Sequence, residues 1–236
     1  MAEATKYRFS FGPWNISEGA DPFGPMVRSP HSFIEKLDWY KPLGFEGVQF
    51  HDDDAVENID DYTPQQVTEK ARETGRALAD RGLTAEFVAP RMWFDSRTVD
   101  GGYTSNSAKD RQYALDRTLR TIDVARELGT PNIVLWLARE GTYVREAKNA
   151  RVAFDRLLEA VNNELEFDRD CRIWIERKPN EPMDHAYVPT IGHALAIAQL
   201  TRDAKRVGCL IESAHAILAG LDPADEIDFA MAFGKL

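Results

Sequence analysis

The sequence predicts an α/β fold in which short parallel strands alternate with helices, and two observations support this. Apolar, β-branched runs recur along the 236 residues, and longer segments with a helical spacing of apolar residues separate them. Proline stands near the start and glycine near the end of several of these longer segments, as is typical of helix boundaries. Repeated βα units imply a parallel sheet with right-handed crossovers.

Six short apolar runs are predicted as strands, because turn residues bound them. These runs are Tyr7–Phe11, Gly47–Phe50, Thr84–Val88, Asn132–Trp136, Ile173–Ile175 and Val207–Ile211. Six helices are predicted after them by periodicity and boundary residues. The helices extend from about Ser29-Pro30 to Gly44, Thr63-Pro64 to Gly82, Ser107 to Leu128 and Glu146 to Leu165, and onward from Thr190 and from Asp222-Pro223.

Two architectures fit this alternation, a doubly wound sheet and a closed eight-stranded barrel. No glycine-rich phosphate loop follows the first strand, which weakens the dinucleotide-binding, doubly wound version. Polar or aromatic residues close nearly every strand, and in a barrel these strand ends converge on one functional mouth. The sequence therefore favours a (β/α)₈ TIM barrel, with closing residues Trp14, His51, Trp93, Trp136, Glu176 and Glu212.

No Pro/Gly/Ser-rich linker divides the chain, so residues 1–236 are predicted to form a single domain. A closed barrel needs eight strands in roughly 250 residues or more, whereas only about six βα units are visible here. Residues 233–236 are typical of the approach to a seventh strand. We therefore expect an incomplete barrel with unpaired strands at its edges.

The composition limits the possible partners. The net charge of −10 argues against nucleic acid, because phosphate binding requires a basic surface. Cys171 and Cys209 are the two cysteines and lack paired spacing, which fits a reducing cytoplasm better than a disulfide framework or a structural zinc site. No apolar run reaches membrane-spanning length, so no membrane partner is expected.

The first candidate for catalysis follows the second predicted strand, where His51 precedes Asp52, Asp53 and Asp54. A histidine with a nearby carboxylate can act as a general acid–base, because the carboxylate orients the ring and raises its basicity. An acidic loop with a merely hydrogen-bonded histidine explains the same residues. Taken alone, the motif favours that second interpretation.

Two further motifs carry possible metal ligands. On a strand, Glu176 and Lys178 face the same side, and such charges form either a compensating ion pair or a metal ligand beside an electrophilic cation. Glu212 and His215 follow the next strand and could share a divalent ion. Two carboxylates and one imidazole suit Mg²⁺, Mn²⁺ or Co²⁺. An N-cap glutamate with a surface histidine explains the last pair equally well.

Tryptophans form the last candidate group, since Trp14, Trp93 and Trp136 stand at predicted strand ends. Apolar walls around a few polar groups are typical of a small-ligand pocket that excludes water. A single tryptophan is more often a packing residue, but three of the five tryptophans at one end of the sheet indicate a pocket.

Taken together, these motifs resemble the xylose isomerase (glucose isomerase) family along the whole chain. The resemblance implies an aldose–ketose isomerase that converts D-xylose to D-xylulose, and D-glucose to D-fructose, by a 1,2-hydride shift with two divalent cations. The matching motifs keep the order and spacing of the family. They are Phe11–Trp14, Asp21–Gly24, Phe50–Asp54, Asp100–Tyr103, Trp136 with Arg139–Gly141, Glu176–Pro182, Pro189–Ala194, Glu212–His215 and Ala219–Leu221.

The resemblance also implies residue roles. The catalytic residues would be His51, held by Asp54, for ring opening, and Lys178 for polarising the O1 atom of the sugar. The metal ligands would be Glu176, Glu212 and His215, with Glu212 bridging both cations. The substrate would contact Trp14, Trp93, Trp136 and Phe23, the last reaching into a neighbouring subunit of a homodimer or homotetramer. The Glu181-Pro182 bond would be cis.

The sequence departs from the family pattern, and two of the departures bear most on the site. Arg91 adds a charge near the predicted pocket, and the later aspartates of the family, which complete both metal sites, are not in this chain. Three rival interpretations follow. One is another sugar isomerase or epimerase of the same superfamily, one is an inactive fragment that binds sugar and metal, and one is an endonuclease of the abasic-site type. The acidic charge and the five histidines weigh against the nuclease.

Overall fold

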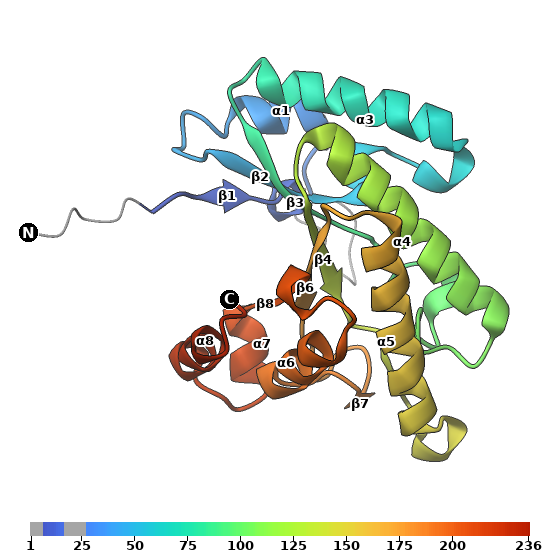
Figure 1. Ribbon diagram of the computed structural model, residues 1–236. Helices are drawn as coiled ribbons and strands as arrows, with labels where there is room; N and C mark the ends of the chain where they lie inside the picture. Colours follow the sequence, from blue (N-terminus) through green and yellow to red (C-terminus); the bar gives the residue numbers. More distant parts are fainter. Residues whose placement is uncertain (1–6, 17–26) are drawn as a thin grey trace, which may run out of the picture. The chain divides into compact units, whose positions relative to one another are not determined.

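The computed structural model describes residues 7–16 and 27–236 and has an α/β fold (Figure 1). The pairs β1–β2, β4–β6 and β6–β8 are parallel, which confirms the predicted parallel sheet. The six strands follow the order β1-β2-β3-β4-β6-β8. They are β1 (Ser10–Phe11), β2 (Gly47–His51), β3 (Thr84–Ala89), β4 (Asn132–Trp136), β6 (Arg172–Glu176) and β8 (Val207–Leu210).

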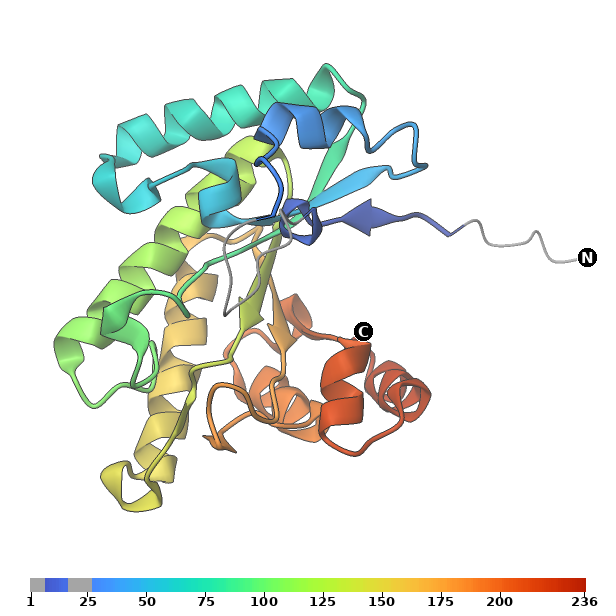
Figure 2. The same cartoon turned by 180° about the vertical axis from the view of Figure 1, so that it is seen from behind.

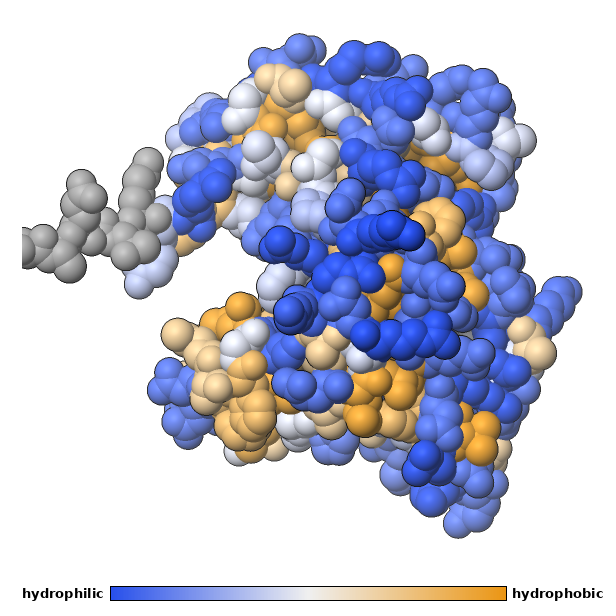
Figure 3. Space-filling model, in the orientation of Figure 1, coloured by the Kyte–Doolittle hydropathy of each residue, from blue (hydrophilic) through white to orange (hydrophobic). Residues whose placement is uncertain are grey.

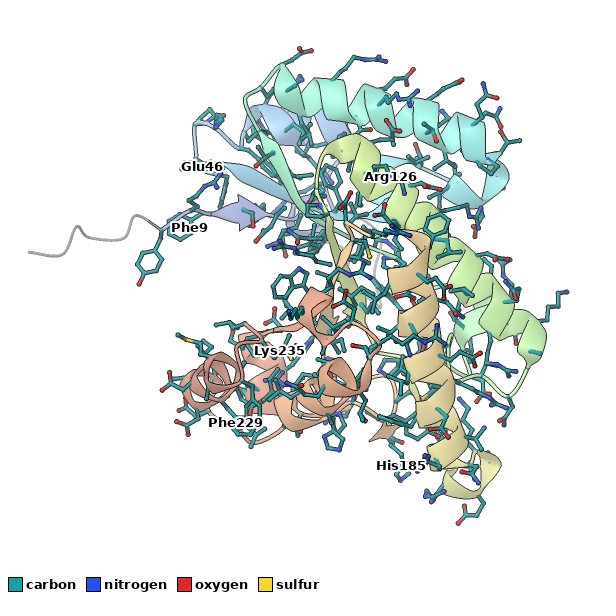
Figure 4. All side chains as sticks on the ribbon, viewed as in Figure 1. Phe9, Glu46, Arg126, His185, Phe229 and Lys235 are labelled. Carbon is teal, nitrogen blue, oxygen red and sulfur yellow. The ribbon has the colours of Figure 1, made fainter. Side chains whose placement is uncertain are left out.

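The chain divides into two compact parts. The first comprises residues up to 88 together with residues 123–130. Its helices are α1 (Phe33–Asp38), α2 (Asp52–Ala55) and α3 (Pro64–Ala79). Val48 and Phe50 of β2 are fully buried in its core. Just before the paired residues of β1 and β2, the Glu46 N–H donates a main-chain hydrogen bond to the Phe9 carbonyl at 2.8 Å. Both residues are labelled in Figure 4.

The predicted bounds of the first helix are wrong. The observed helix α1 begins at Phe33 and not at Ser29-Pro30, because Ser32 is its N-cap and forms a reciprocal capping box with Glu35. It ends at Asp38, and residues 39–44 continue as turns. The first predicted strand is also shorter than expected, since Ser10–Phe11 alone pairs with β2.

The second part comprises residues 89–122 and 131–236. It contains β4, β6, β8 and an unpredicted antiparallel pair, β5 (Gly141–Thr142) with β7 (His185–Ala186). Two-residue strands carry no periodicity that a sequence could reveal. Helix α4 (Ala108–Leu128) starts in this part, followed by α5 (Ala150–Phe167), α6 (Ile191–Leu200), α7 (Ser213–Leu218) and α8 (Pro223–Ala232).

Figures 1 and 2 agree that α6, α7 and α8 lie close together in the second part. Helix α5 begins at Ala150 and not at Glu146, because the Asn149 side chain accepts hydrogen bonds from the N–H groups of Arg151 and Val152. Figure 3 shows apolar side chains gathered over α8, where Phe229, Met231 and Phe233 are exposed.

The strand register in the second part determines which residues lie side by side at the candidate site. Trp136, the last residue of β4, is paired with Glu176, the last residue of β6, which is in turn paired with Leu210 of β8. In β4 the consecutive residues Ile133, Val134 and Leu135 are all buried, whereas β6 buries Ile173 and Ile175 on one face and leaves Trp174 and Glu176 partly exposed on the other. Beyond α8, the Lys235 carbonyl (residue labelled in Figure 4) accepts a hydrogen bond from the Cys209 N–H at 2.6 Å, so the last residues lie beside β8.

Cys171 and Cys209 are both buried free thiols. Across residues 7–16 and 27–236, every helix is too short or too polar to cross a lipid bilayer.

Candidate functional site

The carboxyl ends of β4, β6 and β8 bring charged and aromatic side chains of the second part together. The Nδ1 atom of His215 lies 3.4 Å from Oε1 of Glu176. The Trp136 ring lies nearly parallel to the His215 ring, with 10° between the planes and 6.2 Å between the centroids. The Trp93 ring meets the Trp136 ring edge to face at 4.3 Å. Four of the predicted residues therefore form one cluster.

Helix α7 positions two of the predicted metal ligands, although no helix was predicted there. Glu212 is its N-cap, and the Glu212 side chain accepts a hydrogen bond from the Ala214 N–H at 3.0 Å. The first turn then carries His215 inward, with 10% of its side chain exposed. The N-cap interpretation of Glu212 is thus confirmed, whereas the surface histidine that accompanied it is wrong.

Burial determines the charge of the Glu176–His215 pair. It raises the pKa of Glu176 to about 8, helped by the negative charge of Glu212 and opposed by Lys178 and Arg177. Burial also lowers the pKa of His215 to about 4, helped by the positive charge of Lys178 and opposed by Glu212. At neutral pH the contact therefore joins a mostly protonated carboxyl group to a neutral imidazole.

Lys178 completes the charged residues of this cluster. It is buried, and its Nζ atom lies 3.7 Å from the Glu181 carboxylate. Its positive charge lowers the pKa values of both Glu176 and His215. The Glu181-Pro182 peptide bond is cis, which confirms the prediction from the resemblance.

The chemistry of this donor set fits a divalent cation. The Nδ1 atom of His215 is buried and makes no hydrogen bond within the described residues. A cation binds neutral imidazole and displaces the proton of a carboxyl group, so His215 and Glu176 suit it in the forms that burial imposes. No group of three or more His, Cys, Asp or Glu side chains within residues 7–16 and 27–236 is arranged as a complete metal site. Of the three predicted ligands, Glu176 and His215 are thus in contact, and Glu212 is near enough to shift the pKa values of both.

The remaining predicted residues belong to the first part. The Nδ1 atom of His51 lies 3.1 Å from Oδ2 of Asp54, which also accepts the His51 main-chain N–H at 3.0 Å. The Trp14 ring centroid is 4.1 Å from that of His51. The structure therefore brings together the predicted histidine–aspartate pair and one predicted pocket residue. Phe23 lies outside the described residues.

Sequence reasoning missed Arg177 and Glu226. Arg177 is fully buried, and its Nε atom donates to Glu226 Oε2 at 3.1 Å. Its Nη1 atom donates to the main-chain carbonyl of Glu212 at 3.4 Å. Glu226 stands in the first turn of α8, where an acidic residue is ordinary, so the sequence held no signal for this contact.

Residues 37–236 match the sequence pattern of the xylose isomerase-like TIM barrel family, and the chain therefore belongs to that family. This confirms the predicted fold class. Because the family also includes epimerases, the match does not distinguish xylose isomerase itself.

Solved structures of the same fold are similar to the chain. L-ribulose 3-epimerase matches with a TM-score of 0.69 and 16% identity, over 98% of this chain and 68% of that one. The 3-keto-D-glucoside 4-epimerase YcjR from E. coli matches with a TM-score of 0.64 and 15% identity, over 91% and 74%. D-psicose 3-epimerase, solved in the presence of D-fructose, matches at 0.64 and 16%, over 85% and 64%. The chain thus spans about two thirds to three quarters of their lengths, and these low identities support the fold alone.

Proposed function

We propose that the chain carries the cation and sugar site of a sugar isomerase or epimerase, and specifically of an aldose–ketose isomerase that acts on D-xylose and D-glucose. One observation carries the proposal. A buried Glu176–His215 pair lies beside Trp136 at the carboxyl ends of the strands, with the buried charge of Lys178 acting on both members. Such a site matches the position at which barrel enzymes bind their substrates.

Glu176, Glu212 and His215 would hold the cation, for which Mg²⁺, Mn²⁺ or Co²⁺ is suited, and the resemblance implies two such ions. When bound, the metal supplies Lewis-acid polarisation of the sugar oxygens. Lys178 would donate a hydrogen bond to the sugar O1 atom. Trp93 and Trp136 would cover the apolar face of the sugar and exclude water, which favours hydride transfer over proton exchange with solvent.

The roles assigned by resemblance to the first part stay predictions. His51 with Asp54 would open the sugar ring, and Trp14 and Phe23 would contact substrate. The homodimeric or homotetrameric state and the cytoplasmic location are likewise predictions.

A sugar epimerase is the second candidate, and the named epimerases among the similar structures favour it. Epimerisation beside a ketone removes a proton from the carbon next to the carbonyl group and returns one to it, and a carboxylate at the site could carry that proton.

Labelled sugars separate the two reactions. The chain is incubated with Mg²⁺ or Mn²⁺ and D-xylose deuterated at C2, or with D-fructose in D₂O, and both mixtures are followed by NMR. The isomerase predicts D-xylulose with deuterium at C1, whereas the epimerase predicts solvent deuterium at C3 of the ketose. The Glu176→Gln variant should abolish either reaction. A folded wild-type chain that gives neither product contradicts the proposed activity for this chain.

A further inference from the structure

A buried ion pair lies directly behind the candidate site. The Arg177 side chain is 0% exposed and the Glu226 side chain 12% exposed, with 3.1 Å between Nε and Oε2. Removing two opposite charges from water costs several kcal/mol per ion before their attraction is counted, so such a pair is a weak source of stability. Its place in the fold suggests a different role.

The pair connects four structural elements through two side chains. Glu226 Oε2, on α8, also accepts a hydrogen bond from the Ile191 N–H at the start of α6 (3.3 Å). Arg177 follows Glu176 at the end of β6, and its Nη1 atom donates to the Glu212 carbonyl between β8 and α7. A planar guanidinium group can make both bonds in fixed directions, which a lysine ammonium cannot.

The bond to the Glu212 carbonyl matters because of what else holds Glu212. Its carboxylate accepts the Ala214 N–H at Oε1. Its carbonyl accepts the N–H groups of His215 (3.1 Å) and Ala216 (3.2 Å) within α7, and Arg177 Nη1 (3.4 Å) is the side chain that ties this turn to β6. Together these contacts restrict where the remaining carboxylate oxygen of Glu212 points. Within residues 7–16 and 27–236, Glu226 hydrogen-bonds to Arg177 and to the Ile191 N–H, and not to the Glu176–His215 pair or the tryptophans.

We propose that Glu226, acting through Arg177, is a positioning residue for the Glu212 carboxylate and hence for the cation site. The inference rests on the proposed function, because Glu212 is taken there as a metal ligand. Loss of a residue that orients a metal ligand from behind weakens metal affinity by about 10- to 100-fold. We expect a loss of that size for Mn²⁺ when either member of the pair is changed conservatively.

The variants are Glu226→Gln, which keeps shape but removes charge, and Arg177→Lys, which keeps charge but removes the fork. The matched control is Arg206→Met. Arg206 belongs to the same part, pairs with Asp203 at 2.8 Å and donates to the main-chain carbonyl of Asp168, but contacts no candidate site residue. The Mn²⁺ affinity of each full chain is measured by electron paramagnetic resonance. The Ala214 amide resonance is recorded by NMR without metal, as a direct reporter of Glu212.

A double variant, Arg177→Met with Glu226→Leu, separates positioning from stability. Replacing a buried ion pair by apolar side chains of similar size usually restores stability. Positioning predicts that the unfolding free energy recovers in the double variant, while Mn²⁺ affinity stays weakened and the Ala214 resonance stays displaced. Recovery of all three quantities overturns the inference, and so does wild-type behaviour of Glu226→Gln in both assays.

The proposed function can fail separately. If the wild-type chain binds no Mn²⁺, the cation site is wrong and the Ala214 resonance alone decides. A displaced Ala214 resonance in the Glu226→Gln and Arg177→Lys variants, but not in Arg206→Met, then supports the positioning of Glu212. An unchanged resonance overturns it.

Discussion

Glu164 on α5 is fully buried, and neither oxygen of its carboxyl group makes a hydrogen bond within the part of the chain that the structure describes. The nearby hydroxyl group of Tyr103 is paired with Thr118 at 2.6 Å. Burial therefore raises the pKa of Glu164 to about 8, and the Tyr103 hydroxyl opposes this only in part. A single residue of this kind couples folding to pH.

The sign of that coupling follows from the raised pKa. Between about pH 4.5, the ordinary value, and about pH 8, the folded chain holds a proton that the unfolded chain releases. Stability should therefore fall as pH rises through this window. Glu164→Gln should raise the free energy of unfolding by roughly 1–3 kcal/mol at pH 7 and change it little at pH 4.5. Urea unfolding at a series of pH values measures both.

The control for this experiment is Glu159→Gln, because Glu159 is exposed on the same helix. Its stability curve should run parallel to that of the wild type. A Glu164→Gln curve that also runs parallel would show that Glu164 does not cause the pH dependence.

Glu140 is the opposite case, a buried carboxylate with full hydrogen bonding. Its Oε1 atom accepts from the N–H groups of Gly102 and Tyr103, and its Oε2 atom from the N–H and hydroxyl groups of Thr104. Glu140→Gln places an amide donor against these donors and should cost roughly 1–3 kcal/mol of unfolding free energy. Chemical denaturation measures the loss, with the exposed Glu146→Gln as control. Equal effects of the two substitutions would contradict the role of Glu140.

The sequence predicted which side chains meet only for residues at the ends of paired strands. Glu176 and Trp136 lie at paired strand ends, as expected. The Arg177–Glu226 contact joins residues 49 positions apart, and neither residue differs in sequence context from an ordinary surface charge. Long-range side-chain contacts of this kind depend on helix placement, which periodicity does not give.

At the scale of elements, capping residues decide where the helices begin. Helix α3 starts at Pro64, where it was predicted, because the N-cap Thr63 and Gln66 in the first turn form a reciprocal capping box. Helix α7 was missed because six residues after a strand exit are too few for a helical pattern. Yet this short helix positions Glu212 and His215, so the candidate site depends on the element least visible in the sequence.

The capping box of α3 gives a prediction for the first part. Thr63→Ala removes the side-chain acceptor for the Gln66 N–H and should lower the free energy of unfolding by about 1 kcal/mol. Thr63→Ser keeps a hydroxyl group and should cost much less. Thermal and urea unfolding of the three proteins provide the comparison. An alanine variant as stable as the wild type would show that the cap contributes nothing.

At the scale of the whole molecule, the order of βα units and the family are what the sequence predicted best. Alternation identified five of the six strands of the sheet to within one residue at each end, and the family match confirms the barrel class. Substrate choice could not be predicted in this way, because isomerases and epimerases share this fold and differ in a few side chains.

The central claim is that Glu176, His215 and Glu212 share a divalent cation. Crystals of the chain soaked in Mn²⁺ test it most directly, through an anomalous difference map. We expect a peak at bonding distance, roughly 2.0–2.5 Å, from the Glu176 and Glu212 carboxylates and the His215 imidazole. Mn²⁺ bound only elsewhere, with these three side chains well ordered and no peak between them, would contradict it.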